Sequence, residues 1–276
     1  MYPIQPAFTN VALNTRSTLQ IPAYPASMAK LVLDLTSNGT AGAITTANIS
    51  EVNVKIGSRY IVGPIPASVL ASVNQYNGGA TSTSKLEINL FDRAAASEAW
   101  KEVGALDLPS LNDPVFVEVL NTASAGTPYL NAQVFYCARQ IPDAKDPNSQ
   151  IVQKIKYETL PATGSTKVTW TPRYNGAKIK RIHFRTATNN NIQKVEVKRN
   201  STLVHDNITA DQNTFNLQTL SKVPQANFYH LDFVADGIMQ NFLDTANAQA
   251  LEINIYLSTV EAVNAVVELY DVPYNN

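Results

Sequence analysis

Three histidines and one cysteine are the residues of this chain best suited to proton transfer, nucleophilic attack or metal binding. His183 and His230 each lie inside a run typical of a β-strand, and no two histidines have His-x-x-x-His spacing. The chain has too few such residues for a Cys/His metal cluster, and Cys137 has no nearby partner for a thiol pair. We therefore expect His183, His205 and His230 to be structural or to lie at the surface. We predict no catalytic, cofactor-binding or metal-binding residue.

The sequence motifs of the common enzyme classes are absent. The chain contains no Gly-x-Ser-x-Gly nucleophile elbow and no glycine-rich phosphate-binding loop. Trp100 and Trp170 are the only tryptophans, and they do not mark a sugar-binding cleft. A pair of carboxylates for glycoside hydrolysis stays open at this point, because sequence alone does not exclude one. We expect no enzymatic activity and no cofactor.

Three further groups of polar residues have a simpler explanation than binding. The basic run at 178–181 could contact phosphate or lipid headgroups, but its place at the start of a strand favours a solvated strand end. Asp143, Asp146 and Asn148 could supply oxygen ligands to Ca²⁺, although they match no Ca²⁺-loop spacing. Chance explains the Asn-x-Ser/Thr sequons in a chain so rich in Asn and Thr, at Asn38, Asn48, Asn200 and Asn207.

The composition is that of a globular chain with little charge. Of the 276 residues, 45% are hydrophobic and only 16% are charged, against about 25% in an average domain. A net charge of −1 provides no field to attract nucleic acid or anionic lipid. No stretch approaches the roughly 18 apolar residues of a membrane span, and the first residues lack the pattern of a Sec-type signal peptide. We expect a non-secreted protein with a substantial core.

Short runs of alternating apolar and polar residues dominate the chain. A half-buried strand requires this pattern, because successive side chains face opposite ways. Clusters of Asn, Gly and Ser between the runs predict turns, and helical patterns are expected only at 93–103 and 237–246. The sequence therefore predicts an all-β protein, with its clearest strands at 31–35, 52–56, 86–90, 115–119, 195–197 and 251–255.

The second half of the chain repeats the pattern of the first. A shift of 143 residues lays 49–55 over 192–198 and brings 86–90 close to 229–233. The order of the elements is preserved, so we infer a duplication. Slightly different shifts match two further pairs of strands, 31–33 with 182–184 and 115–119 with 251–255. The core positions expected to be equivalent are Val52 and Val54 in the first copy and Val195 and Val197 in the second.

The duplication also predicts the domain boundaries. Residues 1–14 are expected to form an N-terminal arm rather than a strand, because Pro3 and Pro6 remove backbone donors. The copies themselves are expected at 15–139 and 163–276, joined by a proline-containing linker at 140–162. Each copy has room for eight strands of about 5–6 residues. We therefore predict two tandem eight-stranded jelly rolls with short helices in the loops.

With two such copies in one chain, the sequence resembles the double jelly-roll major capsid proteins of membrane-containing icosahedral viruses, such as the corticovirus and tectivirus phage capsid proteins. The match is one of strand patterns over nearly the whole chain, and no short motif in it is diagnostic. The patterns that carry it are mostly in the second copy, at 180–184, 195–197, 229–233, 251–258 and 266–270. A neutral, charge-poor surface without an active site also suits an assembly protein.

This resemblance implies a structural function in the virion. The chain would form homotrimers of pseudo-hexameric outline that tile an icosahedral shell over an internal membrane, after assembly in the host cytoplasm. Its partners would be other copies of itself, minor capsid or membrane proteins and the internal lipid, without specific recognition of nucleic acid.

Two other classes of protein stay open on the sequence alone. A lectin-like, carbohydrate-binding tandem jelly roll is the alternative function, and exposed aromatic platforms would favour it. A β-sandwich glycosidase is the other, and a close pair of carboxylates in a cleft would identify it.

Overall fold

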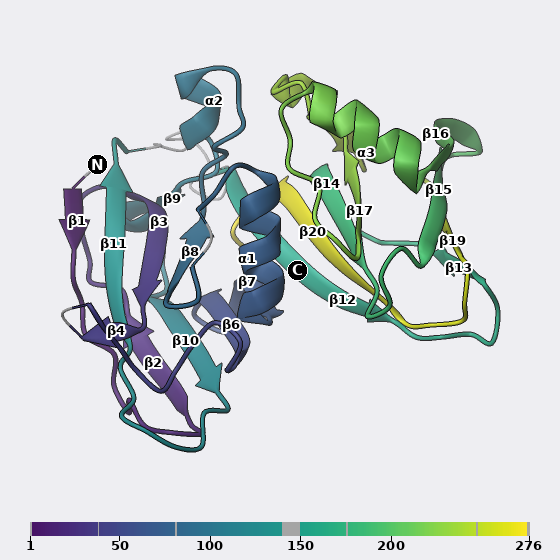
Figure 1. Cartoon of the computed structure of the whole chain (residues 1–276). Helices are drawn as coiled ribbons and strands as arrows, with labels where there is room; N and C mark the ends of the chain where they lie inside the picture. The colour runs from purple at the N-terminus through teal and green to yellow at the C-terminus, as the bar shows by residue number, and fades with distance from the viewer. Residues whose placement is uncertain are drawn as a thin grey trace. The chain divides into compact units, whose positions relative to one another are not determined.

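A computed structural model describes residues 2–37, 39–80, 82–139, 150–174, 176–246 and 248–274. Strands are the dominant regular secondary structure of these residues, with only short helices between them, which confirms the all-β prediction (Figure 1). The chain divides into two compact units. Unit 1 contains the residues up to Lys156 and those from Asp271 onward, and unit 2 contains Tyr157–Tyr270. The chain passes from one unit to the other in β12 (Val152–Leu160) and returns in β20 (Val263–Asp271).

In unit 1, one sheet has the strand order β1-β11-β3-β8 and the other the order β2-β10-β6-β7. Short β9 pairs with β3, and β4 and β5 form a small hairpin. Helix α1 packs against β6 and β8. The bounds are β1 Tyr2–Ile4, β2 Arg16–Gln20, β3 Ser27–Asp34, β4 Thr36–Ser37, β5 Thr40–Ala41, β6 Ile49–Ile56, β7 Arg59–Ile65, α1 Ala67–Tyr76, β8 Lys85–Asn89, α2 Glu98–Glu102, β9 Leu106–Asp107, β10 Val115–Asn121 and β11 Asn131–Cys137.

Unit 2 has the same arrangement. One of its sheets has the order β12-β20-β14-β17, with β18 beside β14, and the other has the order β13-β19-β15-β16. Helix α3 packs against β15, β16 and β17. The bounds of the remaining elements are β13 Lys167–Trp170, β14 Lys178–Arg185, β15 Ile192–Arg199, β16 Thr202–Thr209, α3 Ala210–Thr219, β17 Phe228–Asp232, η3 Met239–Asn241, β18 Leu243–Asp244 and β19 Leu251–Leu257.

The equal strand orders confirm the predicted double jelly roll, because each strand of the two four-stranded orders in unit 1 has a counterpart in unit 2. A shift of 143 residues places β6, β7, α1 and β8 onto β15, β16, α3 and β17. The valines predicted to be equivalent all lie in the core, each at most 1% exposed: Val52, Val54, Val195 and Val197. The predicted register of these strands is therefore confirmed, since a slip by one residue would put these side chains on the opposite face.

Two segments expected outside the sandwiches are strands. In the segment expected to be an arm, β1 pairs antiparallel with β11, and in the expected linker β12 is hydrogen-bonded to β20. Pro3 is compatible with β1 because an edge strand has one side on which no donor is needed. β12 itself contains no proline, so its backbone can complete a ladder. Residues 140–149 of the expected linker, with Asp143, Asp146 and Asn148, lie outside the described residues.

The helices also differ from the prediction. Only Glu98–Glu102 of 93–103 is α-helical, and 237–246 contains the 3-10 turn η3 followed by β18. In this segment the pairing of β18 with β14 overrides the local preference for a helix. The longer helices α1 and α3 were not predicted, although Thr209 and Gln212 form a capping box at the start of α3. No helix within the described ranges is long and apolar enough to span a membrane.

Candidate functional site

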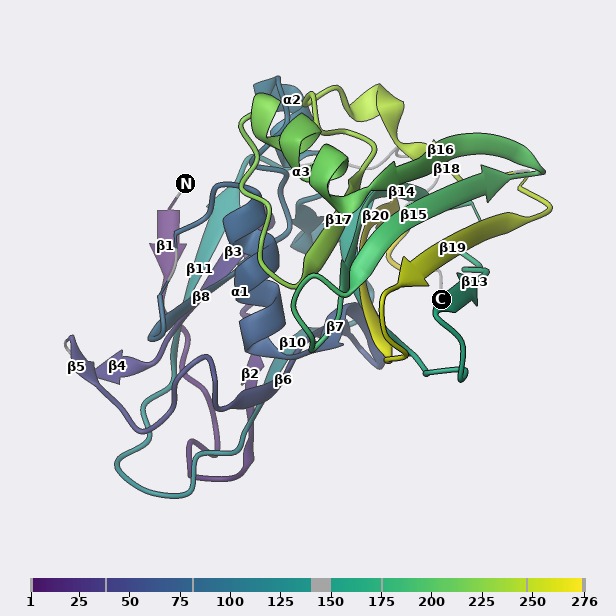
Figure 2. The ribbon, with the colours of Figure 1, turned by 45° about the vertical axis from the view of Figure 1, so that its right-hand side comes forward.

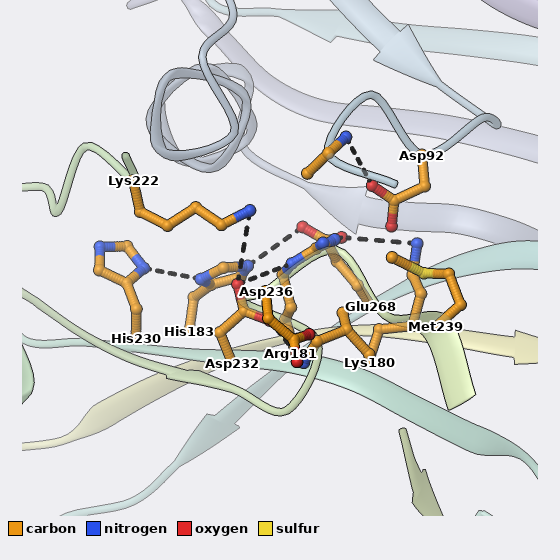
Figure 3. A network of polar contacts seen from close by, with 12 residues as sticks. Asp92, Lys180, Arg181, His183, Lys222, His230, Asp232, Asp236, Met239 and Glu268 are labelled. Carbon is orange, nitrogen blue, oxygen red and sulfur yellow. Dashed lines mark hydrogen bonds and ion pairs between the residues drawn. The ribbon is translucent and has the colours of Figure 1, made fainter. Parts of the chain in front are cut away.

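A cluster of charged and histidine side chains is buried on one face of the β17-β14-β20 sheet of unit 2 (Figure 3). Along β14, Ile182 and Phe184 belong to the hydrophobic core, so the side chain of His183 between them points to the opposite face. We call this cluster the buried polar network. Its members are Lys180, Arg181, His183, Lys222, His230, Asp232 and Glu268, and none of their side chains is more than 7% exposed.

The strand register brings the members of the network together. In the ladder between β14 and β17, Arg181 lies opposite Asp232, and His183 lies opposite His230. In the ladder between β14 and β20, Arg181 lies opposite Glu268. Side chains at such directly opposed positions are within contact distance of each other. Polar residues that are far apart in the sequence therefore meet because of the sheet alone.

Arg181 neutralises two buried carboxylates. Its Nε lies 3.0 Å from Oδ2 of Asp232, and its Nη1 lies 2.9 Å from Oε2 of Glu268. Lys222 Nζ adds a longer contact of 4.0 Å to Asp232 Oδ2. Lys180 Nζ lies 3.9 Å from Glu268 Oε2. Each buried charge is thus held by a partner of opposite sign, without which its burial would cost several kcal/mol.

The two histidines form a chain of hydrogen bonds with a defined direction. The backbone N–H of Gln225 donates to His230 Nε2 over 3.0 Å, so this nitrogen carries no proton. His230 Nδ1 lies 2.7 Å from His183 Nδ1, and His183 Nε2 lies 3.1 Å from Glu268 Oε1. The arrangement that satisfies all three contacts has His230 Nδ1–H donating to His183 and His183 Nε2–H donating to Glu268. Both rings are neutral in this arrangement. A second proton on either ring would place one N–H group directly opposite another N–H group.

The surroundings favour these protonation states. Burial lowers the pKa of His230 well below its usual range, with a smaller contribution from His183. For Glu268, burial acts to raise the pKa, but Arg181, the hydrogen bond from His183 and Lys180 together hold this pKa far below its usual range. An ionised Glu268 and a neutral His230 are therefore the stable states of these two groups at neutral pH.

This arrangement joins secondary-structure elements. Asn213 of α3 donates from Nδ2 to the backbone oxygen of His230 over 2.8 Å, so the helix is tied to the strand that carries the histidine. His183 and His230 are almost completely shielded from solvent, at 0% and 1% exposure. Across the described ranges, no group of three His, Cys, Asp or Glu side chains is arranged to hold a metal ion.

The structure corrects the interpretation of several predicted residues. The basic run 178–181 is not a solvated strand end, because Lys180 and Arg181 are fully buried and paired with acidic residues. His183 and His230 lie buried within strands, and their direct contact was not foreseen. His205 on β16 lies with Nε2 2.9 Å from the hydroxyl of Tyr229.

Cys137 and the two tryptophans have ordinary surroundings. Cys137 ends β11, and burial raises the pKa of its thiol to about 11, so the thiolate is disfavoured. Trp170 packs in the core of unit 2, and Trp100 lies in the short helix α2.

The acidic partners Asp232 and Glu268 escaped the sequence reasoning, although a signal exists for each. Glu268 interrupts the apolar run 263–270, and a charged residue in a buried strand needs an opposite charge nearby. In 229–233, Asp232 shares a strand face with His230 by simple alternation.

Two surface cavities offer room for small molecules, one in each unit. The cavity of unit 2 has a volume of about 600 Å³ and lies between the turn at 190–194, the start of α3 and the loop at 224–228. The cavity of unit 1 has a volume of about 620 Å³ and includes Asp34, which is paired with Lys85. Among the described lining residues, each cavity has a single carboxylate and neither has an aromatic platform beyond Phe228. The paired carboxylates of a glycosidase are therefore not found in either lining.

The matches to known proteins agree with this architecture. The N-terminal domain family of viral coat protein P2 matches residues 4–136, and the C-terminal domain family of the same coat protein matches residues 152–273. No curated protein sequence is detectably similar to the chain.

Several solved capsid proteins share the fold along the entire chain. The major capsid protein P2 of bacteriophage PM2 is 17% identical over 98% of both chains, with a TM-score of 0.83. The STIV major capsid protein is 13% identical, covers 99% of this chain and 98% of its own, and has a TM-score of 0.71. The PBCV-1 virus capsid protein is 11% identical, covers 100% and 96%, and has a TM-score of 0.65.

At these identities the structures demonstrate a common fold, and the two family matches, which together span nearly all of the chain, add the role. That role is structural: self-assembly into the capsid of a virion. The chain belongs to the viral coat protein P2 family and is a double jelly-roll major capsid protein.

Proposed function

We propose that this capsid protein forms a homotrimer with a nearly hexagonal outline, and that these trimers tile an icosahedral shell. The observation that carries the proposal is the equality of the two sandwiches, whose strands have the same order and the same ladders. Three copies around a three-fold axis present six similar sandwiches. Such a block has six nearly equivalent sides for neighbouring trimers, and its cyclic closure satisfies the preference of homo-oligomers for point symmetry.

The composition supports broad contacts between copies. Only 16% of the residues are charged, so the burial of a large surface removes few ions from water. We expect an obligate contact that buries more than about 2,000 Å² in total.

Light scattering tests the trimer directly. The purified chain is expected to have three times the monomer mass of 30.1 kDa, and electron microscopy of assembled material should show hexagonal blocks in a closed shell. A stable monomer at micromolar concentration that never enters particles would contradict the proposal.

We further propose that the shell encloses a membrane, contains minor capsid or membrane proteins, assembles in the host cytoplasm and has no enzymatic, cofactor-binding or metal-binding site. The resemblance to capsid proteins of membrane-containing viruses supports these points. Extraction of purified particles with chloroform is the test of the membrane, since an internal bilayer would contribute lipid to the extract and its removal would inactivate the particle. Particles without lipid would contradict the proposed internal membrane but not the proposed icosahedral shell.

A further inference from the structure

The equivalent strands β7 and β16 differ in their exposure. Their second residues match, since Tyr60 is 45% exposed and Leu203 is 43% exposed. One residue further, Ile61 is 1% exposed in unit 1, while its counterpart Val204 is 43% exposed in unit 2. In β7, Ile61 to Gly63 and Ile65 are all buried, whereas every residue of β16 is exposed or half-buried. The two equivalent strands thus differ, because β7 is largely buried and β16 is largely exposed.

The cover of β7 is the first part of β12. The two strands run parallel, with Ile155 opposite Val62, and both of these side chains are buried. Strand β16 ends its sheet in the order β13-β19-β15-β16, and no described strand pairs with its outer edge (Figure 2). An open strand edge with exposed apolar side chains presents unpaired N–H and C=O groups and is a ready template for another strand.

The duplication identifies the strand that fits this edge. Strand β12 precedes the strands of the second sandwich and is hydrogen-bonded to its last strand, β20. Strand β1 has the same place in the first sandwich, since it comes first and pairs with the last strand, β11. β1 is therefore the counterpart of β12. Within the described part of one chain, β1 pairs with β11 alone, which leaves a second copy to provide the strand for β16.

We propose that β16 of one copy binds the β1 segment of a neighbouring copy, in the parallel manner in which β12 covers β7. This inference rests on the proposed trimer and specifies the surface through which it forms. The contact joins different surfaces of the two copies, so it either closes into a ring or continues as a filament. A closed ring of three chains contains three contacts of β12 on β7 and three of β1 on β16, and these six contacts are alike.

A charged substitution tests the open edge. Val204→Lys places a charge where the side chain is already partly in water, so the fold is expected to persist. We expect the trimer to dissociate to monomer in light scattering. Tyr60→Lys is the matched control, because it makes a similar change at the start of the equivalent strand, one residue before the covered part. The control should remain trimeric, and equal dissociation of both variants would contradict the proposal.

Cross-linking identifies the partner strand. In a Cys137→Ser background, Pro3→Cys and Val204→Cys together should yield covalent dimers and trimers with a short bis-maleimide, and neither single variant should do so. Circular dichroism confirms that each variant is folded. If the protein is trimeric, tolerates Val204→Lys and shows no such cross-link, the proposed β1–β16 contact is wrong. The proposed trimer would not be affected by that result. A monomeric wild-type chain would instead overturn the proposed function.

Discussion

The sheet face that carries the buried polar network in unit 2 has a counterpart in unit 1, and the two faces handle charge in different ways. In unit 1, Lys30 pairs with Glu87 at 3.2 Å, Glu87 also pairs with Arg93, and Lys30 lies over the ring of Phe135. The side chains of Lys30 and Glu87 keep about a fifth of their surface in water. The equivalent positions, matched by their ladders, are Lys30 and Arg181, Val32 and His183, Glu87 and His230, and Phe135 and Glu268.

The comparison teaches that one scaffold permits either a partly solvated ion pair or a fully buried network. A partly solvated pair contributes little, about 0–1 kcal/mol, and tolerates the loss of a member because water replaces it. A buried network has no such replacement, so every donor and carboxylate must have its partner. Unit 2 should therefore be the more sensitive of the two to single substitutions on this face.

The largest expected effect tests the shared core rather than the different faces. Val197→Asp and its counterpart Val54→Asp each bury an unpaired carboxylate, at an expected cost above about 5 kcal/mol, comparable to the stability of a unit. Each variant should unfold its own unit, as mapped by hydrogen exchange. Similar protection in both units of either variant would contradict the equivalence of these positions.

Removal of one carboxylate should cost unit 2 more stability than unit 1. Glu268→Gln leaves Arg181 with incomplete neutralisation and should lower the free energy of unfolding by about 3–5 kcal/mol. Glu87→Gln in unit 1 should lower it by about 1 kcal/mol or less. Denaturant titration measures both, and equal losses would show that burial does not distinguish the faces.

Acid should weaken unit 2 before unit 1. All three histidines lie in unit 2, and the folded pKa of His230 is lowered by burial. The unfolded chain therefore binds protons more readily, and stability falls as the pH drops below the ordinary histidine pKa of about 6.5, by up to about 1.4 kcal/mol per pH unit. His205, whose pKa burial also lowers, acts in the same direction.

Hydrogen exchange between pH 7 and pH 5 measures this difference between the units. A His230→Asn variant is the control, because it is less stable at every pH but should show a smaller pH dependence. An acid response confined to unit 1 would contradict the assignment of a neutral His230.

The smallest expected effect concerns the covering helices. In α1, Asn74 donates to the backbone oxygen of Glu87, whereas in α3 the donor to the equivalent oxygen of His230 is Asn213, one helical turn earlier. Asn213→Leu should cost about 1 kcal/mol in thermal unfolding. Addition of Leu217→Asn, which restores the pattern of α1, should regain part of the loss. No recovery would show that the two helices do not lie equivalently on their sheets.

Strand alternation and self-similarity were sufficient to predict the all-β class, the double jelly roll and the core valines. Both signals depend on local periodicity, which a buried strand face imposes directly on the sequence. The roles of β1 and β12 were missed because they depend on which strand edge lies next to them, and prolines there suggested loops. The network was missed because the contact of His183 with His230 depends on the ladder register between β14 and β17, which local patterns do not encode.

The return of the chain to unit 1 has a consequence for its synthesis. Asp271 pairs with Lys154 at 3.0 Å, and the hydroxyl of Tyr274 accepts a hydrogen bond from the backbone of Asn112, so the last residues complete the first sandwich. On the ribosome, the first sandwich is therefore complete only after the second has been synthesised and residues from Asp271 onward have followed. A chain that is terminated before Asp271 lacks these contacts, so its first sandwich stays incomplete even though nearly all of that sandwich has been synthesised.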